Sequence, residues 1–250
     1  MAVDHRKSKW FLRTPSDRAA RRIFLLPYSG CGASMYRQWP RFIGDIEICP
    51  IQTPGRENRM REPAFRTYPD LASALIDELA PHLDRPFGIF GHCGSALAAY
   101  ETAVQLMAGG GPVPAAVFVS AQVAPQDGPF GTFLDMDDKE LADVIRDMVT
   151  ALGGEPIPEL IQLYREVMRG DLEANAVYHV AEPAKLPCHL TAIGWRDDPT
   201  ITPDMMAGWS QCGDSSFYTL EGGHYEFLQA PQSLLTLMAR SIGHVTEQPR

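Results

Sequence analysis

The stretch Phe87–Glu101, FGIFGHCGSALAAYE, joins a short apolar run to an alanine-rich segment through a turn of small residues. The run before Gly91 predicts a strand, and the apolar spacing after Cys93 predicts a helix. Strand, sharp turn and helix in this order are typical of a nucleophile elbow, where small residues two before and two after the turn let strand and helix approach. Gly91 and Ser95 occupy those positions, so Cys93 stands where the G-x-S-x-G pattern has its serine.

The rest of the chain alternates predicted strands with predicted helices. Runs typical of strands lie at 22–27, 46–51, 87–90, 115–120, 189–194 and 216–220. Helical spacing lies at 70–83, ahead of the elbow strand, and at 232–242 after the last strand. This alternation predicts an α/β fold with a mostly parallel central sheet flanked by helices.

Residues 130–180 interrupt the alternation. No strand is predicted there, and helices are predicted at 137–152, 158–169 and 172–178. Some fifty helical residues exceed what one crossover needs, so we expect an inserted lid that shapes an acyl pocket and excludes water. Ordinary extra helix packing is the alternative.

Composition limits the class of protein. With 45% hydrophobic and 21% charged residues, the 250 residues can bury a full core. Residues 1–22 hold seven Lys/Arg and two Asp, which predicts a basic, flexible segment ahead of a domain at 23–250. Since the whole chain carries −9, that domain is acidic, and we expect no nucleic-acid partner. No apolar run approaches a membrane span or a signal core, so we expect no membrane association and a cytoplasmic protein.

The five cysteines are widely scattered and contain no C-x-x-C pair. Scattered cysteines are typically small core residues, and this spacing predicts neither a zinc site nor a redox pair. Only Cys93 has a context that suggests chemistry. We therefore expect no metal.

Two residues after late strands complete a candidate triad with Cys93. Asp198 follows the strand at 189–194, and His224 follows the strand at 216–220. Because the carboxyl ends of parallel strands meet at one edge of a sheet, these residues are expected to meet the elbow there. The order nucleophile, acid, histidine is that of α/β-hydrolases. Asp197 is the second choice for the acid, and Asp127 the third.

A loop rich in glycine, YSGCGAS at 28–34, follows the first strand. Such a loop exposes backbone N–H groups. In an acyl-transfer enzyme it can supply one of the two donors of an oxyanion hole, and the residue after the nucleophile, here Gly94, supplies the other.

The turn at 53–62, TPGRENRMRE, carries three arginines. Charged turns are usually solvated, but clustered arginines near a site can also contact an anionic partner. The sequence leaves both interpretations open.

Together these motifs resemble the type II thioesterases, the stand-alone α/β-hydrolases of polyketide and nonribosomal peptide biosynthesis. The resemblance spans 23–242 and rests on the stretches FLLPYSGCGAS, YRQWP, PGRENR, FGHCGSALAAYE, GGEP, RGDLEAN, IGWRDDP and GGHYEFL. It implies an α/β-hydrolase fold with a helical lid. For the site it implies a catalytic triad of Cys93, Asp198 and His224, and an oxyanion hole formed by the backbone amides of Ser29 and Gly94.

The resemblance also implies a substrate and a partner. The substrates of the family are acyl groups held as thioesters on the phosphopantetheine arm of acyl or peptidyl carrier proteins. That arm belongs to the partner, so the enzyme itself is expected to need no cofactor.

Two motifs depart from the family. Its elbow usually reads GHSMG and its loop PYAGG, where this chain has GHCGS and PYSGC. Attack by Cys93 would give a thioester, which stays reactive toward amines, alcohols and carbon nucleophiles as well as water. Hydrolysis is the leading expectation, and acyl transfer or cyclisation is the alternative. A non-catalytic carrier-binding scaffold, and Ser95 as the nucleophile, are the remaining alternatives.

Overall fold

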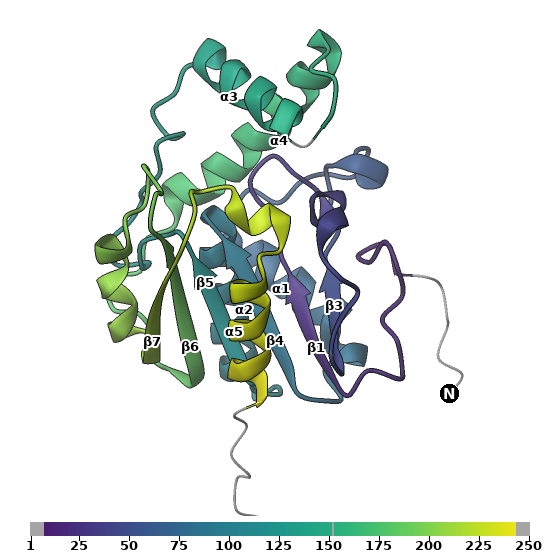
Figure 1. Ribbon diagram of the computed structural model, residues 1–250, viewed down its shortest axis with the longest axis vertical. Coiled ribbons are helices and arrows are strands. Elements are labelled where there is room, and N and C mark those ends of the chain that lie inside the picture. The colour runs from purple at the N-terminus through teal and green to yellow at the C-terminus, as the bar shows by residue number, and fades with distance from the viewer. Residues whose placement is uncertain (1–7, 152, 244–250) are drawn as a thin grey trace, which may run out of the picture.

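The computed structural model describes residues 8–151 and 153–243. They form a seven-stranded sheet in the order β2-β3-β1-β4-β5-β6-β7 (Figure 1). All neighbouring strands are parallel except β2 and β3. The strands are β1 (Arg21–Leu25), β2 (Phe42–Ile43), β3 (Ile46–Pro50), β4 (Phe87–His92), β5 (Ala116–Ser120), β6 (Leu186–Trp195) and β7 (Gly213–Leu220). The predicted parallel sheet is confirmed, and β2 was missed because two residues carry no alternation.

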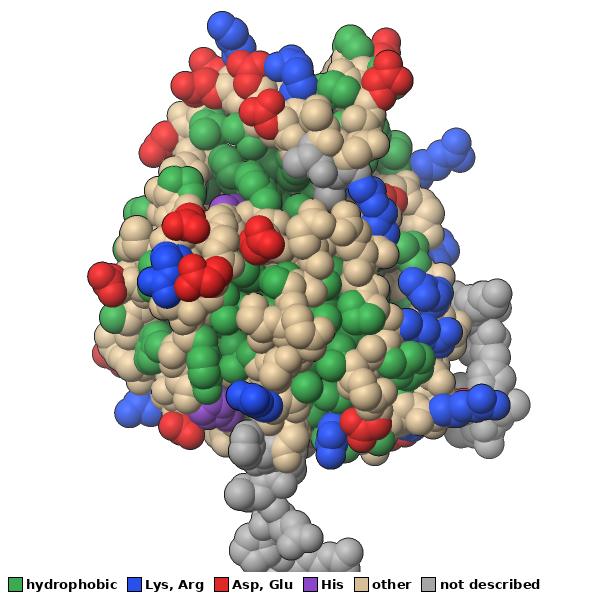
Figure 2. Space-filling model, in the orientation of Figure 1, with side chains coloured by type: hydrophobic (Ala, Val, Ile, Leu, Met, Phe, Trp, Pro, Cys, Tyr) green, Lys and Arg blue, Asp and Glu red, His purple; other side chains and the backbone are tan. Residues whose placement is uncertain are grey.

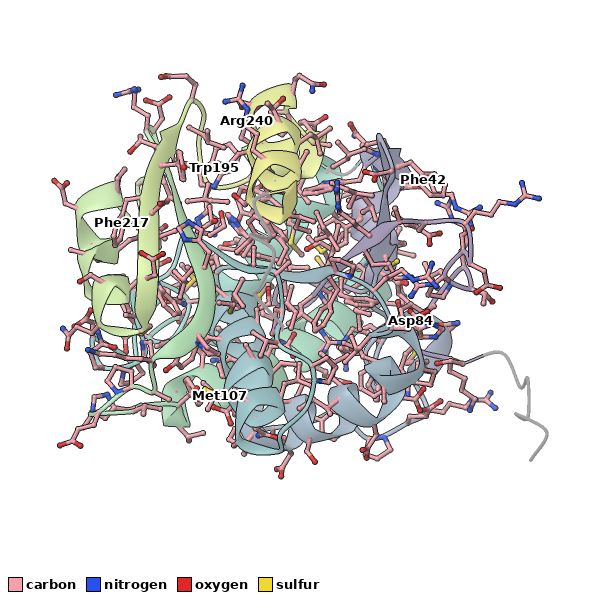
Figure 3. All side chains as sticks on the ribbon, turned by 90° about the horizontal axis from the view of Figure 1, so that it is seen from below. Phe42, Asp84, Met107, Trp195, Phe217 and Arg240 are labelled. Atoms are coloured by element: carbon pink, nitrogen blue, oxygen red, sulfur yellow. The ribbon has the colours of Figure 1, made fainter. Side chains whose placement is uncertain are left out.

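Helices cover both faces of the sheet. α1 (Tyr68–Leu79) and α2 (Gly94–Ala108) lie on one face, and α5 (Gln232–Gly243) lies on the other. In the view from below, Met107 of α2 and Arg240 of α5 mark these opposite layers (Figure 3). Short 3-10 helices complete the connections, namely η1 (Ala33–Gln38), η2 (Glu57–Arg59), η3 (Ala80–His82), η4 (Pro203–Gln211) and η5 (Glu226–Gln229).

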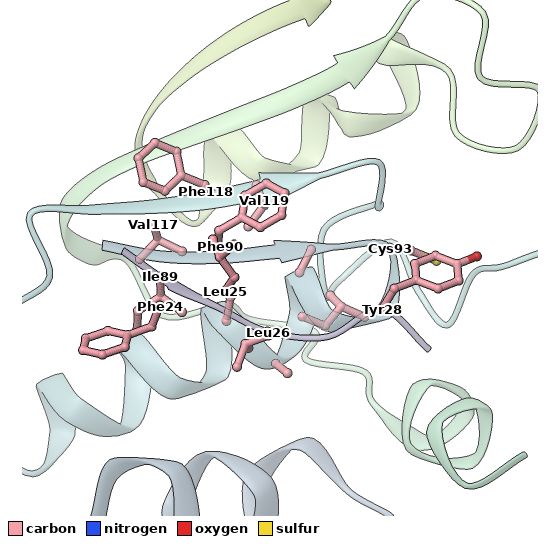
Figure 4. Packing of buried hydrophobic residues seen from close by; sticks show 14 of the residues in the cluster. Phe24, Leu25, Leu26, Tyr28, Ile89, Phe90, Cys93, Val117, Phe118 and Val119 are labelled. Atoms are coloured by element: carbon pink, nitrogen blue, oxygen red, sulfur yellow. The ribbon is translucent and has the colours of Figure 1, made fainter. Parts of the chain in front are cut away.

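The centre of the sheet is fully buried. Every residue of β4 and β5 is buried, as continuous apolar runs predict for parallel strands covered on both faces. Figure 4 shows the rings of Phe24, Phe90 and Phe118 among this packing. It also shows Tyr28 and Cys93 just beyond the carboxyl ends of β1 and β4. A rigid core thus holds the segments that follow these two strands.

The expected helical insertion lies between β5 and β6. It consists of α3 (Asp138–Ala151) and α4 (Pro158–Val177), which lie above the carboxyl edge of the sheet in Figure 1. The prediction of two helices within 158–178 is wrong, because α4 continues through Gly170. A glycine inside a helix costs only about 1 kcal/mol, which packing of the helix can offset. Within the described ranges, no helix is long and apolar enough to cross a membrane.

The N-terminal segment packs more closely than its composition predicts. Trp10 and Phe11 are only 5% and 8% exposed, and Phe11 forms an isolated antiparallel bridge with Ile51. The guanidinium of Arg59 lies 4.6 Å from the ring centroid of Trp10. The expectation of a flexible segment therefore does not hold for residues 8–22, because two aromatic side chains anchor them. Residues 1–7 lie outside the described residues.

Candidate active site

Cys93 occupies the sharp turn between β4 and α2. Its backbone angles are φ 55° and ψ −136°, a strained conformation for a residue with a Cβ. Its amide donates to the carbonyl of Ser120, at the end of β5, over 2.8 Å. A Cβ at Gly91 would lie 2.1 Å from the carbonyl oxygen of Ser95, so only glycine permits this approach of strand and helix. The predicted elbow geometry is present.

Asp198 and His224 meet at the same edge of the sheet. Asp198 follows β6 and His224 follows β7, and Nδ1 of His224 lies 2.7 Å from Oδ2 of Asp198. Because a carboxylate only accepts, Nδ1 carries the proton and donates it. The other carboxylate oxygen accepts from the amides of Thr200 and Ile201, over 2.8 and 3.1 Å. Both side chains are buried, and Nε2 of His224 has no hydrogen-bond partner in the described part of the chain.

The electrostatics of this pair favour a proton on the imidazole. Burial alone lowers the pKa of His224, but the hydrogen bond with Asp198 and the interaction with Cys93 outweigh it and raise that pKa from 6.5 to about 9. For Asp198, burial raises the pKa, and the bonds from His224 and two backbone amides turn the net shift downward. His224 is thus a strong proton acceptor within electrostatic range of the Cys93 thiol.

Ser29 and Gly94 are neighbours at this site. A Cβ built on Gly94 would lie 3.3 Å from Oγ of Ser29. Among the hydrogen bonds of the described residues, neither backbone amide donates to a protein acceptor. An oxyanion hole requires two N–H groups that are free to donate to a substrate oxygen, so these two amides are candidates for one.

Two polar side chains near Gly94 were missed by the sequence analysis. The hydroxyl of Tyr68, from α1, lies 2.7 Å from the position of a Gly94 Cβ, and Nδ2 of Asn175, from α4, lies 4.0 Å from it. Both residues are nearly fully buried, and Oδ1 of Asn175 has no partner in the described ranges. Neither residue follows a strand. Asn175 does belong to the RGDLEAN stretch, which was the only available signal.

The structure separates the other candidates from this cluster. The side chain of Asp197 is exposed, and Asp127 lies beside Gly208 of η4. The hydroxyl of Ser95 donates to the carbonyl of His92 and accepts from its amide, both over 2.9 Å. That hydroxyl therefore has a structural role in closing the elbow.

The remaining cysteines are core residues, as predicted. All are buried. Burial raises the pKa of the Cys31, Cys49 and Cys212 thiols to about 12, and that of Cys188 to about 11. These thiols stay protonated near neutral pH.

Two of the three arginines in the arginine-rich turn match neither of its two sequence interpretations, whereas Arg61 is exposed. Arg56 and Arg59 are both buried. Arg56 forms an ion pair with Asp171 of α4 over 2.7 Å, and Arg59 pairs with Glu62 over 2.6 Å. The charges of Arg56 and Arg59 are therefore paired with carboxylates of the same chain.

The surroundings of the site are apolar, and they include a small cavity. Figure 2 shows hydrophobic side chains gathered between the charged top of the lid and the body below it. A cavity of about 40 Å³, enough for a few waters at most, is lined in part by Ser29, Arg56, Tyr68, Ser95 and Asp171. In residues 8–151 and 153–243, no three His, Cys, Asp or Glu side chains are arranged to hold a metal ion.

The sheet, the elbow and the hydrogen-bonded Asp–His pair define an enzyme of the α/β-hydrolase fold. Residues 21–242 match the family described as thioesterase domain, and the chain belongs to this family. It is close to the type II thioesterases of nonribosomal peptide and polyketide pathways, which confirms the family and the fold that the motifs suggested.

Three proteins show how similar this chain is to its relatives. The chain is 32% identical over 244 residues to linear gramicidin dehydrogenase LgrE of Brevibacillus parabrevis, covering 94% of this chain and 92% of that protein. RedJ, a thioesterase from the prodiginine biosynthetic pathway in Streptomyces coelicolor, is 33% identical, with a TM-score of 0.75 over 90% of each chain. BorB, a type II thioesterase from the borrelidin biosynthetic cluster, is 28% identical, with a TM-score of 0.77 over 91% of this chain and 95% of that one.

Proposed function

We propose that this enzyme hydrolyses acyl groups held as thioesters on the phosphopantetheine arm of an acyl or peptidyl carrier protein. Cys93 is the nucleophile, His224 the base and then the acid, and Asp198 the residue that orients His224. The observation that carries the proposal is the 2.7 Å hydrogen bond between Asp198 and His224 at the edge of the sheet where Cys93 holds its strained turn. Membership of the thioesterase family supports the reaction class.

The first half of the reaction transfers the acyl group to the enzyme. The proton of the Cys93 thiol first passes to Nε2 of His224, and the resulting thiolate sulfur attacks the thioester carbonyl. The amides of Ser29 and Gly94 stabilise the negative oxygen of the tetrahedral intermediate. When the intermediate collapses, the bond to the pantetheine sulfur breaks and that sulfur takes the proton from His224. The products are the free pantetheine thiol and an acyl thioester on Cys93.

The second half releases the acid. His224 takes a proton from water, and the oxygen of that water attacks the acyl carbonyl under the same two amides. Collapse breaks the bond to the sulfur of Cys93, which recovers its proton from His224. The phosphopantetheine belongs to the carrier, so these steps need no cofactor on the enzyme. The descriptions of RedJ and BorB, from biosynthetic pathways, support a carrier protein as the partner.

The test uses an acyl-loaded carrier protein, or an acyl-pantetheine thioester as its small mimic. Wild-type protein is expected to show the mass of one acyl group on intact-mass analysis and to release free acid. Cys93→Ala is expected to show neither, because the substitution removes only the sulfur. Ser95→Ala is the matched control, because it removes the hydroxyl of the elbow and leaves the Cys93 thiol in place. This variant should still be acylated.

The identity of the nucleophile favours one second candidate, acyl transfer or cyclisation. A thioester on Cys93 is as activated as the substrate itself, so an amine, alcohol or carbon nucleophile can compete with water. The same incubation separates the two functions. Free acid as the main product supports hydrolysis, whereas a transferred or cyclised product with little acid supports the second candidate. A wild-type protein that binds carrier but never becomes acylated would contradict both.

A further inference from the structure

One carboxylate of lid helix α4, that of Asp171, forms hydrogen bonds with both the loop after β1 and the arginine-rich turn. Oδ2 of Asp171 accepts a hydrogen bond from the backbone amide of Gly30 over 2.8 Å. The same oxygen accepts from Nη1 of Arg56 over 2.9 Å, and Oδ1 accepts from Nη2 over 2.7 Å. The lid, the loop and the arginine-rich turn therefore meet at Asp171.

Arg56 and its turn hold the loop at two more points. Nη1 of Arg56 donates to the carbonyl of Cys31 over 3.0 Å. The backbone carbonyl of Arg56 accepts from Nε2 of Gln52 over 3.0 Å. Oε1 of Gln52 in turn accepts from the amide of Ala33 over 2.8 Å. The loop is thus tied through Gly30, Cys31 and Ala33.

These ties act on the turn that carries the Ser29 amide. The amide of Cys31 donates to the carbonyl of Tyr28 over 2.9 Å. That carbonyl and the N–H of Ser29 belong to one planar peptide unit, so fixing the oxygen on one side fixes the N–H on the other. Gly30 lies inside the turn with φ +77°, and Asp171 and Arg56 hold the groups on both sides of it. We call the hydrogen bonds that Asp171 and Arg56 form with this loop the clamp. The direction of the Ser29 N–H thus depends on the clamp.

The clamp is buried and has little freedom. The side chain of Arg56 is 7% exposed and that of Asp171 is 18% exposed. A bidentate arginine–carboxylate pair fixes geometry as well as charge, and removing one partner leaves an uncompensated buried charge. Met168, also on α4, lies so close to Gly30 that a Cβ there would be 3.0 Å from its methyl carbon. The lid helix therefore packs directly on the loop.

We infer that Asp171 is a positioning residue for the oxyanion hole, through which the seating of lid helix α4 sets the direction of the Ser29 N–H. The inference rests on the proposed function, since it assigns Ser29 its role there. Displacement of α4 would break the bonds to Gly30 and Arg56 together. Transition-state stabilisation is then complete only when the lid is seated.

The test compares two reactions of Cys93 in Asp171→Asn, an uncharged isostere. Acylation by an acyl-pantetheine thioester develops an oxyanion, whereas alkylation by iodoacetamide displaces iodide at a saturated carbon and develops none. The saturating acylation rate is expected to fall at least about tenfold, and by no more than the 10²–10³ that loss of a whole oxyanion donor costs. The alkylation rate and the KM for the thioester should stay at their wild-type values.

Matched variants distinguish positioning from general damage. Glu173→Gln removes a charge two residues further along α4, from an exposed pair with Arg66, and should leave both reactions unchanged. Arg56→Lys keeps the charge but loses the bidentate contact, so its acylation rate should fall while its alkylation rate stays at the wild-type value. Asp171→Glu keeps the carboxylate, so its acylation rate should lie between those of Asp171→Asn and wild type. The inference is overturned when acylation of Asp171→Asn and Arg56→Lys equals wild type, or when acylation and alkylation fall together. Absence of any wild-type acylation would instead refute the proposed function.

Discussion

At the scale of single residues, Asp198 controls the protonation of His224. Replacing Asp198 by asparagine removes the charge and the carboxylate acceptor that raise the pKa of His224. We expect kcat to fall by about 10²–10⁴, the usual contribution of a positioned acid–base group. The limb of the pH profile of kcat/KM that reports His224 should move to lower pH.

The neighbouring acid provides the control for this prediction. Asp197 carries the same charge one residue away, but its side chain is exposed. Asp197→Asn should therefore retain the wild-type rate and pH profile. A large loss in Asp197→Asn together with a normal Asp198→Asn would show that the acid has been assigned to the wrong position.

At the scale of elements, substitution of one glycine in β4 and one in α4 should have opposite effects on stability. In Gly91→Ala the new Cβ would meet the backbone of Ser95 and Ala96 at 2.1–2.6 Å. Overpacking against backbone at the elbow should destabilise the protein by about 1–3 kcal/mol or more. In Gly170→Ala the new Cβ meets nothing within 4 Å inside α4, so the protein should gain about 0.5–1 kcal/mol. Urea denaturation of both variants measures the difference, and equal effects would contradict the elbow packing.

The N-terminal segment is a second element with a testable role. Trp10 packs against Phe65, with ring centroids 6.3 Å apart, and lies under the guanidinium of Arg59. Trp10→Ala should cost about 3–5 kcal/mol in the free energy of unfolding, as for other buried tryptophans. Leu12→Ala, at an exposed side chain two residues away, serves as the control and should change little. Equal stability of the two variants in urea would mean that this segment contributes nothing to the fold.

At the scale of the whole molecule, His224 links stability to pH. Its folded pKa of about 9 exceeds the unfolded value of 6.5, so the protonated form stabilises the native state. This contribution is complete below pH 6.5 and is lost as pH rises through 9; its size is on the order of 3 kcal/mol. Burial lowers the pKa values of His82 and His92, so their effects fall below that window.

The measurement is urea denaturation at several pH values between 6.5 and 9. Wild-type stability should decline across this window, whereas His224→Gln, which cannot be protonated, should change much less. Parallel curves for the two proteins would contradict the raised pKa.

Much of the candidate site could be predicted because its signals are local. The elbow depends on small residues at fixed spacing around Cys93, and each remaining triad candidate follows a predicted strand within a few residues. Parallel strands place such residues at one edge, so linear order translates into proximity. The single helix through Gly170 was missed, because packing of α4 outweighs the preference of glycine for breaks.

The sequence by itself determined the α/β fold, the elbow at Cys93 and the order of Asp198 and His224, because periodicity and turn chemistry act over a few residues. Only the tertiary structure decided that Arg56 is an internal partner and that Tyr68 and Asn175 approach Gly94. Arg56 and Asp171 are 115 positions apart in the chain. No local pattern specifies such a pairing, since it arises from how α4 packs on the edge of the sheet and from the need to neutralise a buried charge.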